Sequence, residues 1–199
     1  MKRKFLYAVI LCLCLSGCSG ASYPQTAADG AEWSPDWLTH GNLLGIEPPE
    51  GVSLMENYAI LTMNGLTTSV WGVGMPETIT DEDGKETESY QAQIYVLAKE
   101  CADADEASES LADWAARLAE TWSVTDTRET ECNGQLYAVI DCASVSADSP
   151  YNRELAALGR CGSWAVCVEL DCREAFSGDA DAVLSEFLRG CHYNAALRN

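Results

Sequence analysis

Two Asn-Gly dipeptides, Asn64-Gly65 and Asn133-Gly134, constrain the fold of this chain more than any other feature of its sequence. Asn-Gly between two alternating apolar segments is the strongest short-range signal of a β-hairpin, because both residues tolerate the positive φ angles of a tight turn. The flanking segments are residues 58–63 and 66–75 for the first turn, and residues 124–132 and 135–143 for the second. Because such short turns join only antiparallel neighbours, the sequence predicts a mostly antiparallel sheet.

Two helices are predicted beside these hairpins. Apolar residues recur every three or four positions from Ala104 to Trp122, and acids gather in the first turn, where the helix dipole favours negative charge. This pattern predicts a helix over about residues 103–122. A closing helix over residues 180–189 is indicated by Asp179 as its N-cap and by Gly190 directly after its end.

The remaining segments complete the predicted fold class. Strands are expected over residues 43–46, 90–98 and 163–172, and a short helix over residues 151–158, ended by Gly159. The strand at 163–172 is apolar on both sides, so we expect it to be covered on both faces. The prediction is α+β, with a mostly antiparallel sheet of about six to seven strands and two main helices, an arrangement compatible with an α/β/α sandwich.

The order of these elements resembles the PsbP and Mog1 group of α/β/α sandwiches. An early meander, a long amphipathic helix and a late hairpin before a final helix follow one another across roughly residues 43–193. The resemblance rests on element order alone and brings no catalytic residues with it. It implies a binding or assembly role for the domain, as is usual in that group.

The first seventeen residues have the pattern of an export signal. Lys2, Arg3 and Lys4 form a positive start, and the apolar residues 5–15 follow. Crossing a bilayer takes about twenty helical residues, and this apolar segment is too short to do so. It is therefore predicted to be a removable sorting signal and not a membrane span.

The residues that end this signal, Leu15-Ser16-Gly17-Cys18, resemble the lipobox of bacterial lipoproteins. In that family the cysteine at this position is diacylated on sulfur and becomes the first residue of the mature chain, so the resemblance implies lipidation of Cys18. The alternative is an ordinary signal peptide with an incidental cysteine. The expected organisation is a signal peptide at 1–17, a lipidated Cys18 with a flexible tether at 18–41, and a single α+β domain at 42–199.

The acidic composition excludes one class of partner. Without the three cations of the first four residues, nine Lys and Arg stand against 31 Asp and Glu, a formal net charge of −22. Nucleic acid is therefore not an expected partner, because phosphate binding needs a basic surface. The same charge repels anionic lipid headgroups, so attachment to the membrane is expected to depend on the acyl chains of Cys18.

Seven cysteines lie beyond the signal and the lipobox. They are Cys101, Cys132, Cys142, Cys161, Cys167, Cys172 and Cys191. An odd number leaves at least one thiol unpaired. Disulfide bridges and free buried thiols both remain open, because bridges persist only in oxidising surroundings. No Cys-x-x-Cys spacing occurs, so a structural zinc site is not expected.

The sequence predicts no catalytic residue and no cofactor. The two histidines, His40 and His192, lie in the predicted tether and beside the last helix, and no Gly-x-Ser-x-Gly motif is present. Cys191 precedes His192, but side chains of consecutive residues generally point apart, so this adjacency does not predict a catalytic pair. The acids are too numerous for sequence alone to single out a pair for hydrolysis.

Three tryptophans and two aspartates are the candidate ligand contacts. Trp33, Trp37 and Trp71 fall outside the predicted buried stripes, and docking of the first two on the domain is the alternative to an exposed ligand platform. Asp81-Glu82-Asp83-Gly84 resembles part of a calcium loop. Aligning its glycine with an EF-hand puts Ile79 and Tyr90 at ligand positions, which excludes that motif. A looser calcium site at Asp81 and Asp83 stays open beside a solvated loop.

These observations favour a non-catalytic binding or assembly module at the cell envelope. It is expected at the outer face of the cytoplasmic membrane, anchored through Cys18, with an envelope protein or a small ligand as its partner. One alternative is an extracytoplasmic hydrolase that acts on cell-wall or extracellular substrates through carboxylates. The other is a structural envelope component. A deep cleft holding two or more acids with Trp71 nearby would favour the hydrolase.

Overall fold

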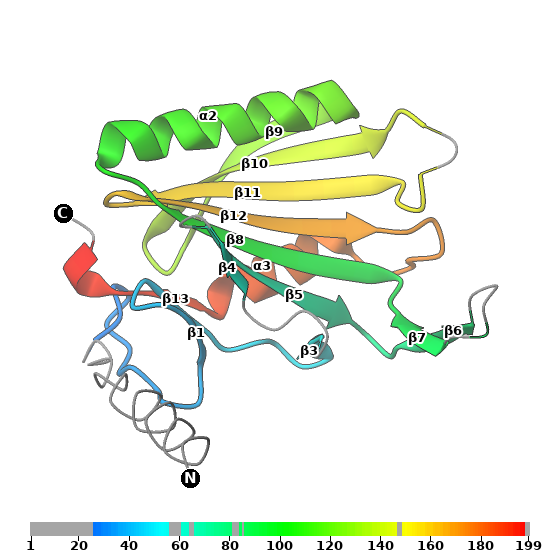
Figure 1. The fold of residues 1–199 in the computed structure, drawn as a ribbon, viewed down its shortest axis with the longest axis horizontal. Coiled ribbons are helices and arrows are strands. Elements are labelled where there is room, and N and C mark those ends of the chain that lie inside the picture. The colour runs from blue at the N-terminus through cyan, green and yellow to red at the C-terminus, as the bar shows by residue number, and fades with distance from the viewer. Residues whose placement is uncertain are drawn as a thin grey trace, which may run out of the picture.

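The computed structural model describes residues 26–55, 61–63, 66–80, 84, 86–146 and 149–197. In these residues an eight-stranded sheet lies between two helices (Figure 1). Its strand order is β3 (Val52–Leu54), β5 (Leu66–Val73), β8 (Ala92–Glu100), β12 (Trp164–Cys172), β11 (Arg153–Cys161), β10 (Gln135–Ser144) and β9 (Trp122–Cys132), with β4 (Leu61–Met63) paired to β5. Every pairing in this sheet is antiparallel. The predicted α+β class is confirmed.

Both predicted helices are present. Helix α2 spans Ala104–Thr121, and its N-cap Asp103 accepts hydrogen bonds from the backbone of Asp105 and Glu106. Helix α3 spans Ala180–Arg189, with Asp179 as its N-cap and Gly190 as its C-cap. The side chains of Asp103 and Asp179 accept hydrogen bonds from backbone groups that the start of a helix leaves unpaired, which is why the sequence marks the two starts so clearly.

The two helices cover opposite faces of the sheet, because side chains alternate between faces along each strand. Leu184, Phe187 and Leu188 of α3 lie in the main core with sheet residues of one face, among them Trp71, Ile94, Leu155 and Val168. Leu111, Trp114 and Leu118 of α2 pack against residues of the other face, among them Ile140, Ala156, Leu158 and Cys167. The strand at 164–172 is therefore covered by α3 on one face and, at Ala165 and Cys167, by α2 on the other, so the predicted cover on both faces is present over the first half of the strand.

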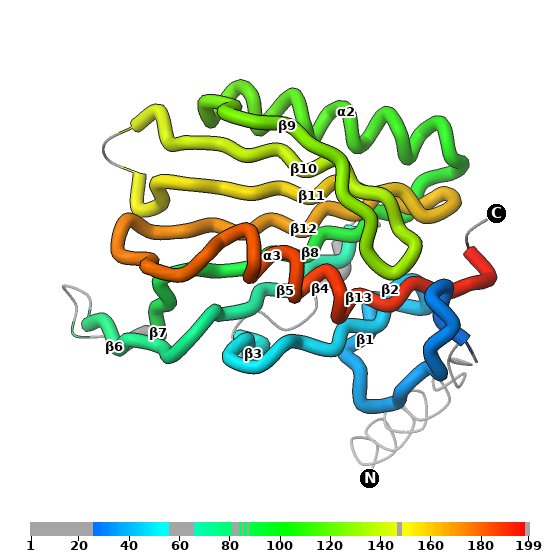
Figure 2. Tube along the Cα trace, turned by 180° about the vertical axis from the view of Figure 1, so that it is seen from behind, coloured from blue at the N-terminus to red at the C-terminus, as the bar shows by residue number. Residues whose placement is uncertain are grey.

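Two smaller sheets lie at opposite ends of the domain (Figures 1 and 2). At one end, β2 (Leu44–Ile46) pairs with both β1 (Leu38–His40) and β13 (Cys191–Tyr193), and the 3₁₀ turn η2 (Ala195–Leu197) follows. At the other end, β6 (Glu77–Thr80) and β7 (Glu86–Ser89) form a hairpin of their own.

The second predicted hairpin has the expected turn. Asn133 and Gly134 adopt φ angles of 51° and 68°, between Cys132 and its register partner Gln135. The amide nitrogen of Asn133 also donates to the carbonyls of Arg189 and Cys191, at 2.7 Å and 3.1 Å. These hydrogen bonds join the turn to the last residue of α3 and to the first residue of β13. Met63 and Leu66 pair around the first predicted turn, whose two residues lie outside the described part of the chain.

Two sequence predictions about local structure are wrong. Residues 153–161 form strand β11 where a short helix was expected at 151–158. The segment is apolar on both faces, so its periodicity cannot separate a helix from a strand, and pairing with both β10 and β12 decides the outcome. Trp122 begins β9 instead of ending the long helix.

The folded part begins earlier than the predicted domain boundary at residue 42. Thr26 and Ala27 form β-bridges with Glu32 and Asn194. From there the chain runs into β1, so residues 26–40 of the predicted tether pack on the domain. Residues 1–25, which include Cys18, lie outside the described part.

Candidate functional site

A row of polar side chains crosses the sheet on the face that also carries α2. Asp171 of β12 pairs in register with Gln93 of β8 on one side and with Glu154 of β11 on the other. One step along the strands, Glu169 is the register partner of Tyr95. Residues two apart on a strand point to the same face, so these five residues lie together. We call them the polar row.

Helix α2 leaves part of this face to the polar row. The helix packs on β9, β10, β11 and β12, and Figure 1 shows β8 and β5 lying beyond it. Glu154 is only 5 % exposed, whereas Tyr95, Glu169 and Asp171 keep part of their surface in solvent. Gln93 is also buried, at 8 % exposure, so the row is accessible from solvent at Tyr95, Glu169 and Asp171.

Burial raises the pKa values of the three acids of the row, and for Glu154 and Asp171 the neighbouring negative charges raise them further. Burial, followed by the charges of Asp171 and Glu169, raises the pKa of Glu154 to about 8. The pKa of Asp171 rises to about 7 through burial and the neighbouring Glu169. Burial also raises the pKa of Glu169, against the effect of the Cys167 thiol, which donates to its carboxylate at 3.4 Å. Near neutral pH Glu154 and Asp171 are therefore partly protonated.

No described ion pair provides a cation to these carboxylates. The described salt bridges of Lys99, Arg128 and Arg153 all go to other acids. The carboxylate atom Oδ1 of Asp171 is buried and has no hydrogen-bond partner among the described residues. A buried polar atom without a partner costs about 1–3 kcal/mol. The row can therefore accept a hydrogen-bond donor, and a positively charged donor best.

Aromatic groups border the row. The hydroxyls of Tyr95 and Tyr151 both donate to the amide oxygen of Gln93, at 2.8 Å and 3.0 Å. The guanidinium of Arg173 lies 5.7 Å from the ring centre of Tyr151, and Trp122 hydrogen-bonds to Glu154. Carboxylates beside aromatic faces are a combination that binds organic cations in proteins.

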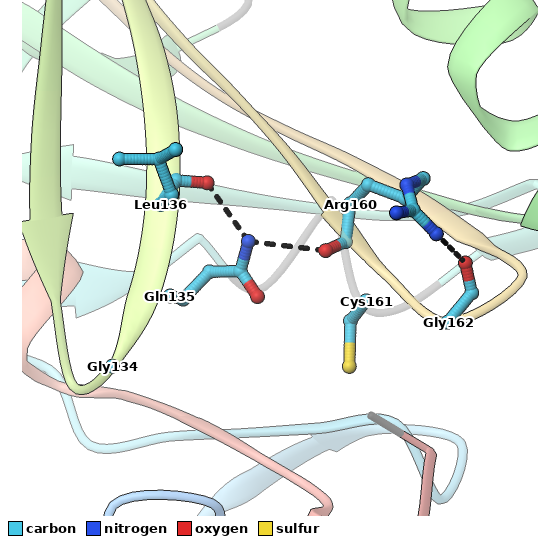
Figure 3. Close-up of a pocket in the computed structure, with 6 residues that line it drawn as sticks. All are labelled: Gly134, Gln135, Leu136, Arg160, Cys161 and Gly162. Atoms are coloured by element: carbon cyan, nitrogen blue, oxygen red, sulfur yellow. Dashed lines mark hydrogen bonds between the residues drawn. The ribbon is translucent and has the colours of Figure 1, made fainter. Parts of the chain in front are cut away.

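A separate pocket lies at the opposite end of the strands (Figure 3). It has a volume of about 270 Å³ and is lined by Gly134, Gln135, Leu136, Arg160, Cys161 and Gly162. The amide nitrogen of Gln135 donates to the carbonyls of Leu136 and Arg160, at 2.8 Å and 3.1 Å. Arg160 donates to the carbonyl of Gly162 at 2.9 Å. These hydrogen bonds stabilise the backbone at the β9–β10 and β11–β12 turns. No carboxylate is among the residues that line the pocket.

The three tryptophans proposed from the sequence are not gathered in one place. Trp71 is 2 % exposed and lies on the α3 face, where its indole donates to Ser69 at 2.9 Å. Trp33 is 7 % exposed and meets Trp37 edge to face. Trp37 stacks on His192 with ring centres 4.1 Å apart. Trp33 and Trp37 dock on the domain, and Trp71 belongs to its core.

The structure brings together one histidine and one serine that no sequence motif had indicated as a pair. Nε2 of His40 lies 2.8 Å from the hydroxyl of Ser69, a distance that suits a base and a nucleophile. Both side chains are fully buried, and burial lowers the pKa of His40 to about 4. The pair has no access to a substrate, so it stabilises the attachment of β1 to β5.

The other predicted sites divide into two groups. Cys18, Asp81 and Asp83 lie outside the described residues. The seven cysteines beyond the lipobox are all described, and none of them forms a disulfide bond within the described residues. Within the described ranges, no group of three or more His, Cys, Asp or Glu side chains is placed to hold a metal ion.

Sequence reasoning missed the polar row, although part of its signal was present. In the strand at 164–172, alternation puts Ala165, Cys167 and then the acids Glu169 and Asp171 on one face. Two acids in a strand that is otherwise apolar on both sides are unusual and could have been singled out. Glu154 could not be placed beside these acids, because residues 151–158 were predicted to form a helix.

Comparisons with known proteins identify no family for this chain. No model of a known protein family matches it, and no curated protein does. The solution structure of cyanobacterial PsbP (CyanoP) from Synechocystis sp. PCC 6803 is similar, with a TM-score of 0.41 and 10% sequence identity over 82% of this chain and 98% of that chain. No helix in the described residues has the length and apolar character needed to cross a membrane.

Proposed function

We propose that this protein is a lipoprotein of the cell envelope whose α+β domain binds a partner without catalysis. Acyl chains on Cys18 hold it at the outer face of the cytoplasmic membrane. The export pattern of residues 1–17 and the lipobox-like Leu15-Ser16-Gly17-Cys18 support this location. The docking of the chain from Thr26 onward supports a domain that stays close to its anchor.

The polar row is the binding surface of the proposed module. The observation that carries this assignment is a set of three adjacent carboxylates, Glu154, Glu169 and Asp171, with no cation in the described ion pairs and with one orphaned oxygen. A bound cationic group, such as an amine or a guanidinium, would pair with the carboxylates and satisfy that oxygen. The nearby rings of Tyr95 and Tyr151 would cover its aliphatic part.

The hydrolase alternative gains no support from the site. Acids with Trp71 nearby in one cleft were the arrangement expected of an enzyme. The acids of the polar row lie on the α2 face, whereas Trp71 packs with Phe187 on the α3 face. The carboxylates and this tryptophan are therefore separated by the sheet.

Titration with a small cation tests the binding surface. Nα-acetyl-lysine amide is added to the isotope-labelled protein while amide NMR signals are recorded at pH 6 and pH 9. Because Glu154 and Asp171 ionise between these values, the dissociation constant is expected to fall about tenfold or more at the higher pH. The signals of Gln93, Tyr95 and Glu169 should shift most.

Matched controls make the result specific. Nα-acetyl-norleucine amide has a similar stem without the charge and should cause no shift. Asp171→Asn should weaken lysine binding, whereas Glu129→Gln, at an exposed position of β9, should leave it unchanged. Equal affinity at both pH values, or equal effects of the two substitutions, would refute the polar row as a cation-binding surface.

A further inference from the structure

The chain joins the domain at one end of the long axis. Thr26 and Ala27 form bridges with Glu32 and Asn194, and the backbone nitrogen of Ala28 donates to Tyr193 at 2.7 Å. Eight Cα steps separate Cys18 from Thr26, a span of at most about 28 Å. An anchor at Cys18 therefore keeps the end of the domain that carries β13 near the membrane.

Side-chain contacts fix this attachment. Nδ1 of His192 lies 2.8 Å from the carboxylate of Asp29, and the His192 ring stacks on Trp37. The rings of Trp33 and Trp37 lie against Gly45 of β2. Because these contacts join residues 29–37 to both β2 and β13, the first described residues cannot swing to the other end of the domain.

Most of the exposed large apolar side chains of the described residues lie at the far end. In the described part of the chain, five large apolar residues are exposed. Four of them lie at the end that carries the β6–β7 hairpin: Met75 after β5, Ile79 within β6, Val124 near the start of β9, and Val145 after β10. Figures 1 and 2 both show this end opposite β13. The fifth, Leu136, lies near the anchored end. Because β5 and β10 are four strands apart in the sheet, these residues form two pairs, which lie on either side of β8, β12 and β11, the strands of the polar row.

The far end is also acidic. The polar row lies there, because Gln93 is near the start of β8, Asp171 near the end of β12 and Glu154 near the start of β11. Glu77 and Glu88 add exposed carboxylates on β6 and β7. A second copy of this chain would bring a net charge of the same sign to the contact, and anionic lipid would also be repelled.

We infer that the end carrying β6, β7 and the polar row is a docking surface for a protein that presents basic and apolar side chains and approaches from the side away from the membrane. This inference rests on the proposed function, since the anchor at Cys18 sets which end faces outward. Basic groups of the partner meet the acids of the row, and its apolar groups cover Met75, Ile79, Val124 and Val145.

One sample tests both the surface and its orientation. The acylated full chain, isotope-labelled and held in phosphatidylcholine nanodiscs, is titrated with a seven-residue peptide of alternating lysine and valine. Amide signals of residues 75, 79, 124 and 145 are expected to shift, and the matched glutamate–valine peptide should leave them in place. The double variant Met75→Ser/Val145→Ser should weaken binding about fivefold or more. Leu136→Ser, at the anchored end, should not change it.

Nitroxide-labelled headgroups in the same nanodiscs report the orientation. Signals of residues 26–47 should broaden, while those of residues 77–80 should keep their intensity. Peptide shifts centred on Leu136 or Arg160, no shifts with either peptide, or broadening of the β6–β7 hairpin would each overturn the inference. Lack of acylation at Cys18 would instead refute the proposed function, and the peptide titration in detergent would still show whether this surface binds.

Discussion

At the scale of single residues, the three acids of the polar row lie where burial raises the free energy needed to ionise them. Glu154 is buried and faces Asp171 across the strand pair. Its folded-state pKa, near 8, lies above the ordinary value of 4.5. At this group the folded protein therefore binds more protons than the unfolded chain between these values, so the contribution of Glu154 to stability is greatest below about pH 4.5 and is lost as the pH rises through 8.

The first prediction is a pH-dependent effect of Glu154→Gln. The amide cannot ionise, so the decline in the free energy of unfolding between pH 5 and pH 9 should become shallower, by up to about 1.4 kcal/mol per pH unit. Urea unfolding at a series of pH values measures this slope. Glu129→Gln on the exposed strand β9 is the control and should keep the wild-type slope. A steeper decline in Glu154→Gln would show that the buried acid is stabilised in its charged form.

Gly45 provides the second prediction, because the two docked tryptophans lie against it. A Cβ atom at this position would lie 2.6 Å from Cε3 of Trp37 and 3.2 Å from Cζ2 of Trp33. Gly45→Ala should therefore lower the free energy of unfolding by about 1–3 kcal/mol. In a Trp37→Ala background the same change should cost much less. Equal costs in the two backgrounds, measured by chemical denaturation, would show that Trp37 does not pack there.

At the scale of secondary-structure elements, local signals predicted most of the fold. The stripe after Asp103 and the caps of residues 180–189 placed both helices almost to the residue. Asn133-Gly134 placed the β9–β10 turn, because the required φ angles select those residues. These features depend on neighbours in sequence, which is why sequence reasoning reaches them.

Elements decided by distant neighbours were harder to predict. The apolar pattern of β11 is compatible with either a helix or a strand, and pairing with β10 and β12 makes the segment a strand. The docking of residues 26–37 depends on His192 and Gly45, which no local pattern reveals. The polar row needs the register of β8, β11 and β12 together, so it could not be assembled before the strand order was known.

Asn133 carries the third prediction, at the scale of the β9–β10 turn and α3. Asn133→Gly keeps the positive φ but loses the hydrogen bonds to Arg189 and Cys191, which should cost about 1 kcal/mol. Asn133→Ala should cost about 1–2 kcal/mol more, because alanine is strained at φ 51°. Thermal or chemical unfolding of the pair checks this order. Equal stabilities would show that the turn does not require the left-handed conformation.

At the scale of the whole molecule, one end receives the chain and the opposite end carries the exposed apolar residues and the acids. This division follows from the antiparallel sheet, whose strands run the length of the domain between the two ends (Figure 1). Residues 26–37 are attached to the first end through the contacts of Asp29 and Trp37 with His192. The proposed anchor at Cys18 therefore determines how the rest of the molecule is presented.

The fourth prediction concerns that anchor and tests the central proposal directly. The intact mass of the protein purified from the membrane fraction is expected to equal residues 18–199 with a diacylglyceryl group on the Cys18 sulfur. Cys18→Ala, which leaves every described residue unchanged, should move the protein to the soluble fraction. A polypeptide that retains residues 1–17 without any lipid mass, or a Cys18→Ala variant that stays with the membrane, would contradict the account.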